Sequence, residues 1–302
     1  MAHNQRNGFT LIELSIVLVV IGLIVGGILV GRDLIEVATI RQQISQIEKY
    51  NTAVHTFQSK YNCLPGDCAN AGAFGFLARS AERGDGDGNG VIEGFVTANG
   101  SAPGGGGEGS LFWADLSMAG LIEGVFGQGI YAAFGVYGPY WPVSGATIND
   151  YLPQAKLGNN AYVYAYSGGY FTGAWYGWIS NNINYFGLDT ISSIGNGIIG
   201  TSHGLTVQQA FVIDTKVDDG LPQSGRVMAQ YVSEYIQFVG AGTTVLSPDG
   251  SLGAISALPT TDATNGSGTT CYDNGGIVGA QHYSTEMNGR IGLNCALSFQ
   301  FQ

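Results

Sequence analysis

The sequence predicts an α+β protein in which one long N-terminal helix packs on, and projects from, a β-rich globular head. Leu14 to Val30 contain no charged residue, and an apolar stripe with helical spacing follows them. Beyond residue 62, short β-rich segments alternate with turns rich in Gly, Asn and Ser. Hydrophobic residues make up 45% of the 302-residue chain, which is too apolar for general disorder and sufficient for a large core.

Composition and charge exclude two classes of protein. The chain has 11 Lys and Arg against 22 Asp and Glu, a net charge of −11, so it has no basic surface for nucleic acid. Its 49 glycines follow no three-residue period, which excludes collagen. Residues 100–302 hold few Lys and Arg, and such a charge-poor surface favours a head that packs against copies of itself or lies outside the cell.

The helix is expected over residues 9–61, in two parts. Residues 9–31 form an apolar stretch of about 23 residues, and about 20 suffice to cross a bilayer. Residues 32–61 are amphipathic and should form a stalk. The apolar positions of this stalk recur at three- and four-residue steps: Val37, Ile40, Ile44, Ile47, Val54, Phe57 and Tyr61. One continuous helix of about 53 residues would be roughly 80 Å long.

Glu13 is the exception in the apolar stretch. A carboxylate there costs at least about 2.5 kcal/mol unless it is paired, so an acid in a membrane span indicates a function. No other residue of the span is expected to pair with it. Its partner should therefore be another molecule or a chain terminus.

The residues around Glu13 carry a family resemblance. Gly8-Phe9-Thr10-Leu11-Ile12-Glu13, after a short polar leader and before the apolar run, resembles the type III signal of the type IV pilin superfamily. The resemblance implies that a prepilin peptidase cuts after Gly8 and methylates Phe9, the new N-terminus. It divides the chain into a leader (1–8), the helix (9–61, of which 9–31 would lie in the membrane or the filament core) and the head (62–302).

The resemblance also implies a mechanical function. The chain would wait in the inner membrane and then join copies of itself and related pilins in an extracellular filament, with membrane lipid, prepilin peptidase and an inner-membrane assembly platform as partners. Two alternatives remain: a periplasmic pseudopilin of a type II secretion system, or a membrane-tethered enzyme or receptor. Catalysis is not expected, because the four histidines are scattered and no Gly-x-Ser-x-Gly nucleophile elbow is present.

The sequence predicts a few secondary-structure elements of the head. Pro65-Gly66 should end the long helix, because neither residue continues one well. Two short helices and two strands are expected in addition. They are a helix from Ser110 as N-cap to Ala119, stopped by Gly120; a helix from Thr206, paired with Gln209 in a capping box, to Lys216; and strands at Ala161–Tyr166 and Arg226–Phe238.

The four cysteines form two local pairs, Cys63 with Cys68 and Cys271 with Cys295. Their spacing does not match a zinc site. A head beyond a membrane span faces an oxidising compartment, so two disulfides are favoured over buried free thiols. The C-terminal pair also resembles the cystine loop of pilins.

The segment 85–93 predicts a structural calcium site. Asp85, Asp87 and Asn89 stand at positions 1, 3 and 5 of an EF-hand-like loop, with Gly90 at position 6. The backbone of Val91 and the side chain of Glu93 would add ligands. Position 12, where the pattern requires Glu, is Val96, so either Glu93 would have to replace it or ligands must come from elsewhere in the head. The alternative is a solvated acidic turn that binds no metal.

Overall fold

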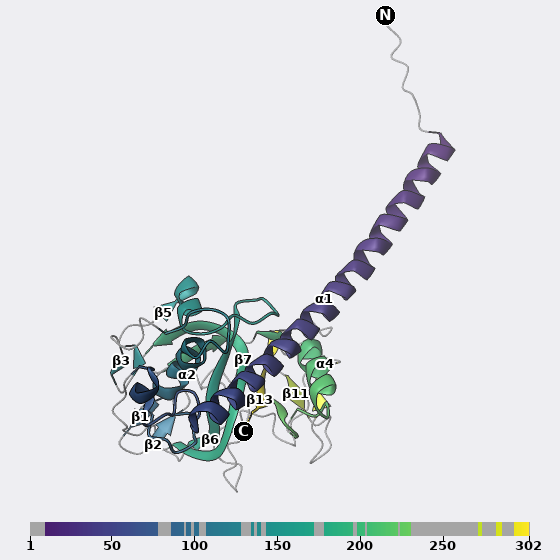
Figure 1. Ribbon diagram of the computed structural model, residues 1–302. Coiled ribbons are helices and arrows are strands. Elements are labelled where there is room, and N and C mark those ends of the chain that lie inside the picture. Colours follow the sequence, from purple (N-terminus) through teal and green to yellow (C-terminus); the bar gives the residue numbers. More distant parts are fainter. Residues whose placement is uncertain are drawn as a thin grey trace, which may run out of the picture.

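The computed structural model has the α+β architecture that the sequence predicts: a long N-terminal helix projects from a head built on an antiparallel sheet (Figure 1). It describes residues 10–77, 86–93, 95–97, 100–102, 107–127, 134–135, 138–139, 143–171, 178–195, 198–202, 204–222, 224–230, 271–273, 282–285 and 293–301.

Helix α1 runs without interruption over Leu11–Tyr61. Thr10 caps its N-terminus, and Asn62 ends it in the left-handed conformation at φ 56°. The helix therefore stops just before Pro65-Gly66, which lie in the following turn. Figure 1 shows its N-terminal half standing clear of the head and its C-terminal half lying across it. Within the described residues, α1 is the one helix long and apolar enough to cross a membrane.

The stalk buries one face of α1 against the head. Ile40, Ile47, Val54 and Phe57 of the predicted stripe are buried. Val37, also expected in the stripe, is 40% exposed, because contact with the head begins only near Ile40. The apolar periodicity therefore extends one turn further towards the N-terminus than the packing does.

Gln43 and Gln46 join the stalk to the head through hydrogen bonds. Both side chains are buried. Gln43 Oε1 accepts bonds from the backbone N–H groups of Lys156 (2.7 Å) and Leu157 (3.3 Å). Gln46 Nε2 donates to the Gln154 carbonyl oxygen at 2.9 Å. These polar contacts fix the position of the helix along the head, which the apolar contacts alone would define less sharply.

A seven-stranded antiparallel sheet forms the centre of the head, with the long strand β7 (Trp178–Gly195) in the middle. Strand β6 (Ala161–Phe171) pairs with β7 along most of its length, with Val163 opposite Leu188. Strand β13 (Leu293–Gln300) also pairs with β7, so the end of the chain returns to the middle of the sheet. The other strands of this sheet are β5 (Val143–Ser144), β8 (Ile198–Ser202), β9 (Leu205–Thr206) and β10 (Val227–Gln230).

Shorter elements surround the sheet. Two 3-10 helices and three two-stranded ribbons complete the described structure. They are η1 (Ala71–Phe74), η2 (Gly145–Asp150), β1 (Phe95–Thr97) with β2 (Gly100–Ala102), β3 (Phe134–Gly135) with β4 (Gly138–Pro139), and β11 (Tyr272–Asp273) with β12 (His282–Tyr283).

The two short helices follow the predictions with one correction. Helix α4 (Val207–Val217) begins as expected, with the reciprocal capping box between Thr206 and Gln209. Helix α2 (Gly107–Met118) begins three residues before Ser110, so Ser110 as N-cap was wrong. Ser110 Oγ instead donates to the Gly107 carbonyl oxygen inside the first turn, at 2.8 Å. Gly120, at φ 68°, ends this helix as predicted.

The two predicted strands differ from the observed ones in length. Strand β6 continues to Phe171, beyond the predicted end at Tyr166. Residues 161–167 are buried on both faces, so no polar alternation marks where this strand ends. Of the strand expected at Arg226–Phe238, Val227–Gln230 forms β10, and residues 231–238 lie outside the described part of the chain.

Aromatic side chains from distant parts of the chain form the core where α1, α2 and the sheet meet. Trp113 and Phe112 of α2 pack edge to face, with ring centroids 5.1 Å apart. The ring centroid of Phe186 of β7 lies 4.4 Å from that of Phe301, which follows β13. Tyr50 of α1 packs on Trp113 at 4.9 Å. The stalk is thus part of the core of the head and not only a tether.

Candidate functional site

The first turn of α1 carries the sequence-predicted assembly residue, Glu13. Glu13 Oε2 accepts hydrogen bonds from the backbone N–H of Thr10 (2.8 Å) and from its hydroxyl (2.7 Å). The Glu13 N–H in turn donates to Thr10 Oγ1 at 3.3 Å, which completes a capping box. The expectation that nothing in the span pairs with Glu13 was therefore wrong: Thr10, three residues earlier, partly satisfies it. Gly8 and Phe9 lie outside the described residues.

The segment after Glu13 is apolar on every face and makes no contact that buries it. Residues 10–30 are all exposed, and no charge appears until Arg32 and Asp33. A helix that is apolar all round needs either a membrane or a protein core to cover it. The head covers neither face of this part of α1, so a bilayer or another molecule must do so.

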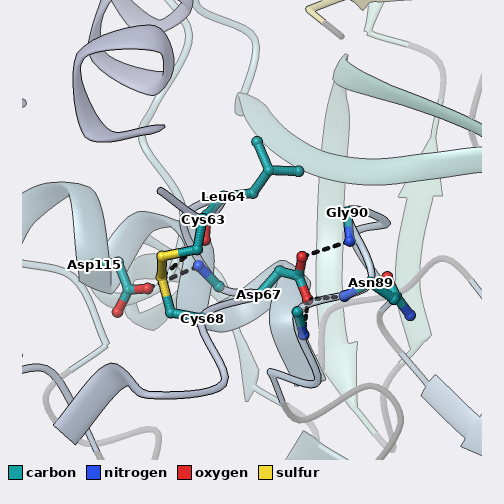
Figure 2. The surroundings of a disulfide bond; sticks show 9 residues. Cys63, Leu64, Asp67, Cys68, Asn89, Gly90 and Asp115 are labelled. Carbon is teal, nitrogen blue, oxygen red and sulfur yellow. Dashed lines mark hydrogen bonds between the residues drawn. A yellow bond between two sulfur atoms is a disulfide. The ribbon is translucent and has the colours of Figure 1, made fainter. Parts of the chain in front are cut away.

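A disulfide closes the turn that follows α1. Cys63 and Cys68 are joined across Leu64-Pro65-Gly66-Asp67, with their Cα atoms 5.3 Å apart. Within the turn, the Gly66 N–H donates to Asp115 Oδ2 of α2 at 2.7 Å. Figure 2 shows the disulfide with Asp115 on one side and Asp67 on the other. The turn is thereby attached to α2, and the Asp67 side chain points towards residues 88–90 (Figure 2).

Asp67 binds the backbone of the predicted calcium loop. Its Oδ1 accepts bonds from the N–H groups of Gly88 (2.7 Å) and Asn89 (3.2 Å), and its Oδ2 accepts one from Gly90 at 2.8 Å (Figure 2). Burial raises the pKa of Asp67 to about 6, and the nearby Asp87 carboxylate raises it too, although the three amide bonds oppose the shift. The carboxylate thus organises a loop that has few side chains of its own to pack.

Glu108, in the first turn of α2, binds the other half of the same loop. Its Oε1 accepts bonds from the N–H groups of Gly86 (2.9 Å) and Asp87 (3.4 Å), and its Oε2 from Glu93 at 2.9 Å. Burial raises the pKa of Glu108 well above its ordinary value, and the charges of Asp67 and Glu93 raise it further. Two buried acids outside the loop therefore hold it by its backbone.

The structure brings one predicted ligand together with these two acids. Carboxylate oxygens of Asp67, Asp87 and Glu108 all lie within 4.8 Å of one another. We call these three residues the carboxylate cluster. Three carboxylates in so small a volume repel one another, and hard oxygen donors of this kind suit Ca²⁺. The donor set therefore fits the predicted ion in its chemistry, although only Asp87 comes from the predicted ligands.

The other predicted ligands are not part of the carboxylate cluster. Asn89 Nδ2 donates to Asp87 Oδ2 (3.1 Å) and Glu93 Oε2 (3.4 Å), which puts the amide between those two carboxylates. Asn89 Oδ1 accepts a bond from the Val91 N–H at 2.7 Å. Glu93 is buried, and Asp85 lies outside the described residues. The sequence pattern missed Asp67 and Glu108 because neither belongs to the loop. For Asp67, the sequence offered one signal of a structural role: this acid lies between Cys63 and Cys68, in a turn that a disulfide closes.

The second disulfide joins Cys271, just before β11, to Cys295 of β13, with Cα atoms 5.1 Å apart. Both predicted cysteine pairs are thus disulfides, and no described cysteine is free. Close by, the Tyr283 hydroxyl donates to Asp214 Oδ2 of α4 at 2.7 Å. The disulfide connects the ribbon of β11 and β12 to the central sheet, and the Tyr283–Asp214 hydrogen bond connects it to α4. Both contacts are structural.

Comparison with known proteins identifies the N-terminal segment. Residues 3–29 match the model of the prokaryotic N-terminal methylation motif, the prepilin signal of type IV pilins and pseudopilins. No curated protein and no solved structure matches the chain. The match covers most of the predicted leader, the predicted cleavage motif and most of the apolar part of α1, and it stops short of the stalk and the head.

Proposed function

We propose that this chain is a structural subunit of a type IV pilus-like filament. Its leader is removed by prepilin peptidase after Gly8, Phe9 is methylated, and the apolar half of α1 holds the subunit in the inner membrane until assembly. The prepilin signal at residues 3–29 supports the processing and the membrane-anchored precursor.

One observation carries the proposal of assembly. Residues 10–30 of α1 are exposed throughout, while residues 40–57 bury one face of the helix against the head. The apolar segment therefore lies outside the folded head, and the molecules that contact it can change without a change in the head. In the bilayer it contacts lipid, and in a filament it would contact the same segment of other subunits. Such an exchange leaves the structure of the head unchanged.

The proposed contact between subunits joins the amine of Phe9 to the Glu13 carboxylate of a neighbour. Removal of the leader creates this amine at the start of the apolar segment. Thr10 occupies Oε2 of Glu13, and Oε1 has no hydrogen-bond partner among the described residues. A cationic donor at Oε1 would form a charge-assisted bond in surroundings of low polarity, where such bonds are strong. One pair would supply both attraction and register.

An exposed pilus is favoured over a secretion pseudopilus because of the head. It is large, acidic and poor in Lys and Arg, with a surface suited to packing in a polymer outside the cell. The test is fractionation of the source cells. Filaments sheared from the surface should contain the chain with its mature N-terminus, whereas recovery only from the envelope, together with a secretion defect in cells lacking it, would favour the pseudopilus.

We also propose that the carboxylate cluster holds a structural Ca²⁺ ion. Asp67, Asp87 and Glu108 supply the hard oxygen atoms, and the loop around Asn89 and Glu93 supplies others. The ion would relieve the repulsion between the carboxylates and stabilise the glycine-rich loop. In a filament outside the cell, where calcium is plentiful, a weak site of the extracellular type would stay filled.

A further inference from the structure

A pocket lies at the end of α1 farthest from the apolar segment. Its volume is about 480 Å³, within the range of small-molecule sites. It lies between the last turn of α1, the disulfide turn and η1, and the backbone of Gly88 and Gly90 forms another part of the wall. The pocket therefore lies where α1 joins the head, at the end of the helix remote from residues 10–30. The pocket lies outside residues 3–29, which match the methylation motif, and outside the apolar segment at 10–30.

Amide side chains dominate the polar lining. Gln58, Asn62 and Asn70 line the pocket, all three are exposed, and none of their side chains bonds another described residue. An amide group both donates and accepts hydrogen bonds, as a hydroxyl group does. A ligand that carries several hydroxyl groups can therefore satisfy these amides whichever way each hydroxyl points.

One wall is aromatic. Phe74 of η1 is 45% exposed, unusual for a phenylalanine, and its ring packs against Tyr61 with centroids 5.2 Å apart. Tyr61 is itself held by Phe57 and Phe76, so the support behind Phe74 is rigid. An exposed aromatic ring on a fixed support offers an apolar surface to the C–H face of a flat, otherwise polar molecule.

The charge of the pocket selects against anionic ligands. Among the described residues no Lys or Arg lines it, and the one acid among them, Asp67, already accepts hydrogen bonds from Gly88, Asn89 and Gly90. An anion would meet this carboxylate with no compensating cation among these lining residues. A neutral ligand avoids that cost and still uses the amides and the aromatic wall.

We propose that this pocket binds a neutral sugar ring, free or at the end of a glycan, with its C–H face on Phe74 and its hydroxyl groups on Gln58, Asn62 and Asn70. The proposal does not depend on filament assembly, because the pocket is formed within one chain by the last turn of α1 and the head. It assigns the region where α1 joins the head a binding role in addition to the structural one.

The test uses the full-length chain in detergent micelles. Saturation-transfer NMR is recorded with methyl glycosides of glucose, galactose and mannose and with N-acetylglucosamine, and a glycan array distinguishes free from glycan-terminal sugars. We expect transfer to the ring C–H protons of at least one sugar, and its loss in Phe74→Ala. Asn70→Ala should weaken binding about fivefold, the effect of one hydrogen bond. Val125→Ala, at a residue 66% exposed and outside the pocket, should bind as wild type does.

Three results would overturn the proposal: no transfer to any of the sugars and no glycan bound on the array, binding unchanged in both Phe74→Ala and Asn70→Ala, or transfer only to tetramethylammonium, which would show a cation site at Asp67. Circular dichroism establishes that each variant folds. If Phe74→Ala does not fold, Asn70→Ala and Gln58→Ala carry the test, because both positions are exposed.

Discussion

Thr10 and Glu13 form a closed hydrogen-bonded pair at the start of α1, with the Thr10 N–H and hydroxyl both donating to Glu13 Oε2, at 2.8 and 2.7 Å. The pair satisfies one oxygen of the carboxylate within the chain. Because hydrogen-bonded charges are less costly to bury, this pair would lower the cost of placing Glu13 in the proposed membrane span. The second oxygen is left for a donor from another molecule.

Glu13→Ala should leave membrane insertion intact or improve it, and should abolish assembly. The substitution removes a carboxylate from an apolar segment and, with it, the proposed partner of the neighbouring amine. Glu13→Gln is the matched control, because it keeps an oxygen that can accept from Thr10 but carries no charge. We expect it to assemble poorly as well. Membrane fractionation and the yield of sheared filaments measure the two effects, and normal filaments from Glu13→Ala protein would exclude Glu13 from the mechanism.

Assembled protein should begin at Phe9 with a methylated amine. Cleavage after Gly8 is the prediction from the resemblance of residues 8–13 to a prepilin signal, and these residues lie within the matched methylation motif at 3–29. Replacing Gly8 by a bulky residue such as Trp should block cleavage and leave the precursor in the membrane fraction. Intact-mass and N-terminal peptide analysis of filaments provides the readout. A filament population that starts at Met1 or Ala2 would contradict this assignment.

Calcium should raise the melting temperature of the folded chain, because an ion that binds only the native state stabilises it by mass action. The stabilisation would reach about 2.7 kcal/mol at a concentration one hundred times the dissociation constant. Asp87→Asn should remove the calcium dependence, while Asp150→Asn, at an exposed position outside the carboxylate cluster, should retain it. Differential scanning calorimetry in EDTA and in millimolar calcium tests both. Equal midpoints for the wild-type protein would argue against the site.

Gly66→Ala should destabilise the head strongly. Gly66 has φ +87°, and a Cβ atom there would fall within 2.4 Å of the Glu108 carbonyl oxygen. Gly75 is the matched control, since it has φ +85° but open space around its Cβ position. Gly75→Ala should cost about 1 kcal/mol from backbone strain, and Gly66→Ala at least about 2 kcal/mol more from the clash. Urea unfolding measures the loss of unfolding free energy in both variants. Equal losses would mean that the backbone around Gly66 shifts enough to relieve the clash.

Asp189→Asn should stabilise the protein at neutral pH. Asp189 is fully buried, and Oδ1 accepts from the N–H groups of Thr190 and Gly204, but Oδ2 has no partner among the described residues. Burial raises the pKa of this carboxyl well above its ordinary value. The native state therefore binds the proton more tightly than the unfolded chain, whose pKa is about 3.9, and stability falls as pH rises from there towards the native pKa.

The asparagine variant stays neutral, so its advantage in melting temperature should be absent near pH 4 and grow towards pH 7. Asp150→Asn removes the same charge from an exposed position and should change little across this range. Thermal unfolding followed by circular dichroism at several pH values gives the comparison. A variant less stable than wild type at pH 7 would mean that Asp189 is ionised and satisfied in the native state.

Local signals in the sequence predicted the parts of the fold whose causes are local. The Thr206–Gln209 capping box, the Gly120 stop and the apolar spacing of the stalk each act within about one or two helical turns, and each is found in the structure. Ser110 failed as an N-cap because it is one of several small residues before Leu111, and spacing alone does not choose among them.

The site in the head was predicted only in part, because its bonds join distant segments. Asp67 contacts Gly88, Asn89 and Gly90 across 21 to 23 residues, and Glu108 contacts Glu93 across 15. A motif within residues 85–93 contains no information on these acids. Gln43 and Gln46 were missed for a similar reason: glutamine on a helix surface indicates solvent, and only the partner segment at 154–157 makes burial favourable.

The glutamine contacts of the stalk determine how a pull on the helix would reach the rest of the molecule. Gln43 and Gln46 form hydrogen bonds with the backbone of residues 154–157. This stretch and the preceding Pro153 are bonded to β6: the Ala155 N–H donates to the Ala161 carbonyl oxygen, and the Val163 N–H donates to that of Pro153. A load applied along α1 would therefore reach β6 and β7, the longest strand pair of the sheet. The many ladder hydrogen bonds of this pair would share the load, so it would not fall on the loops alone.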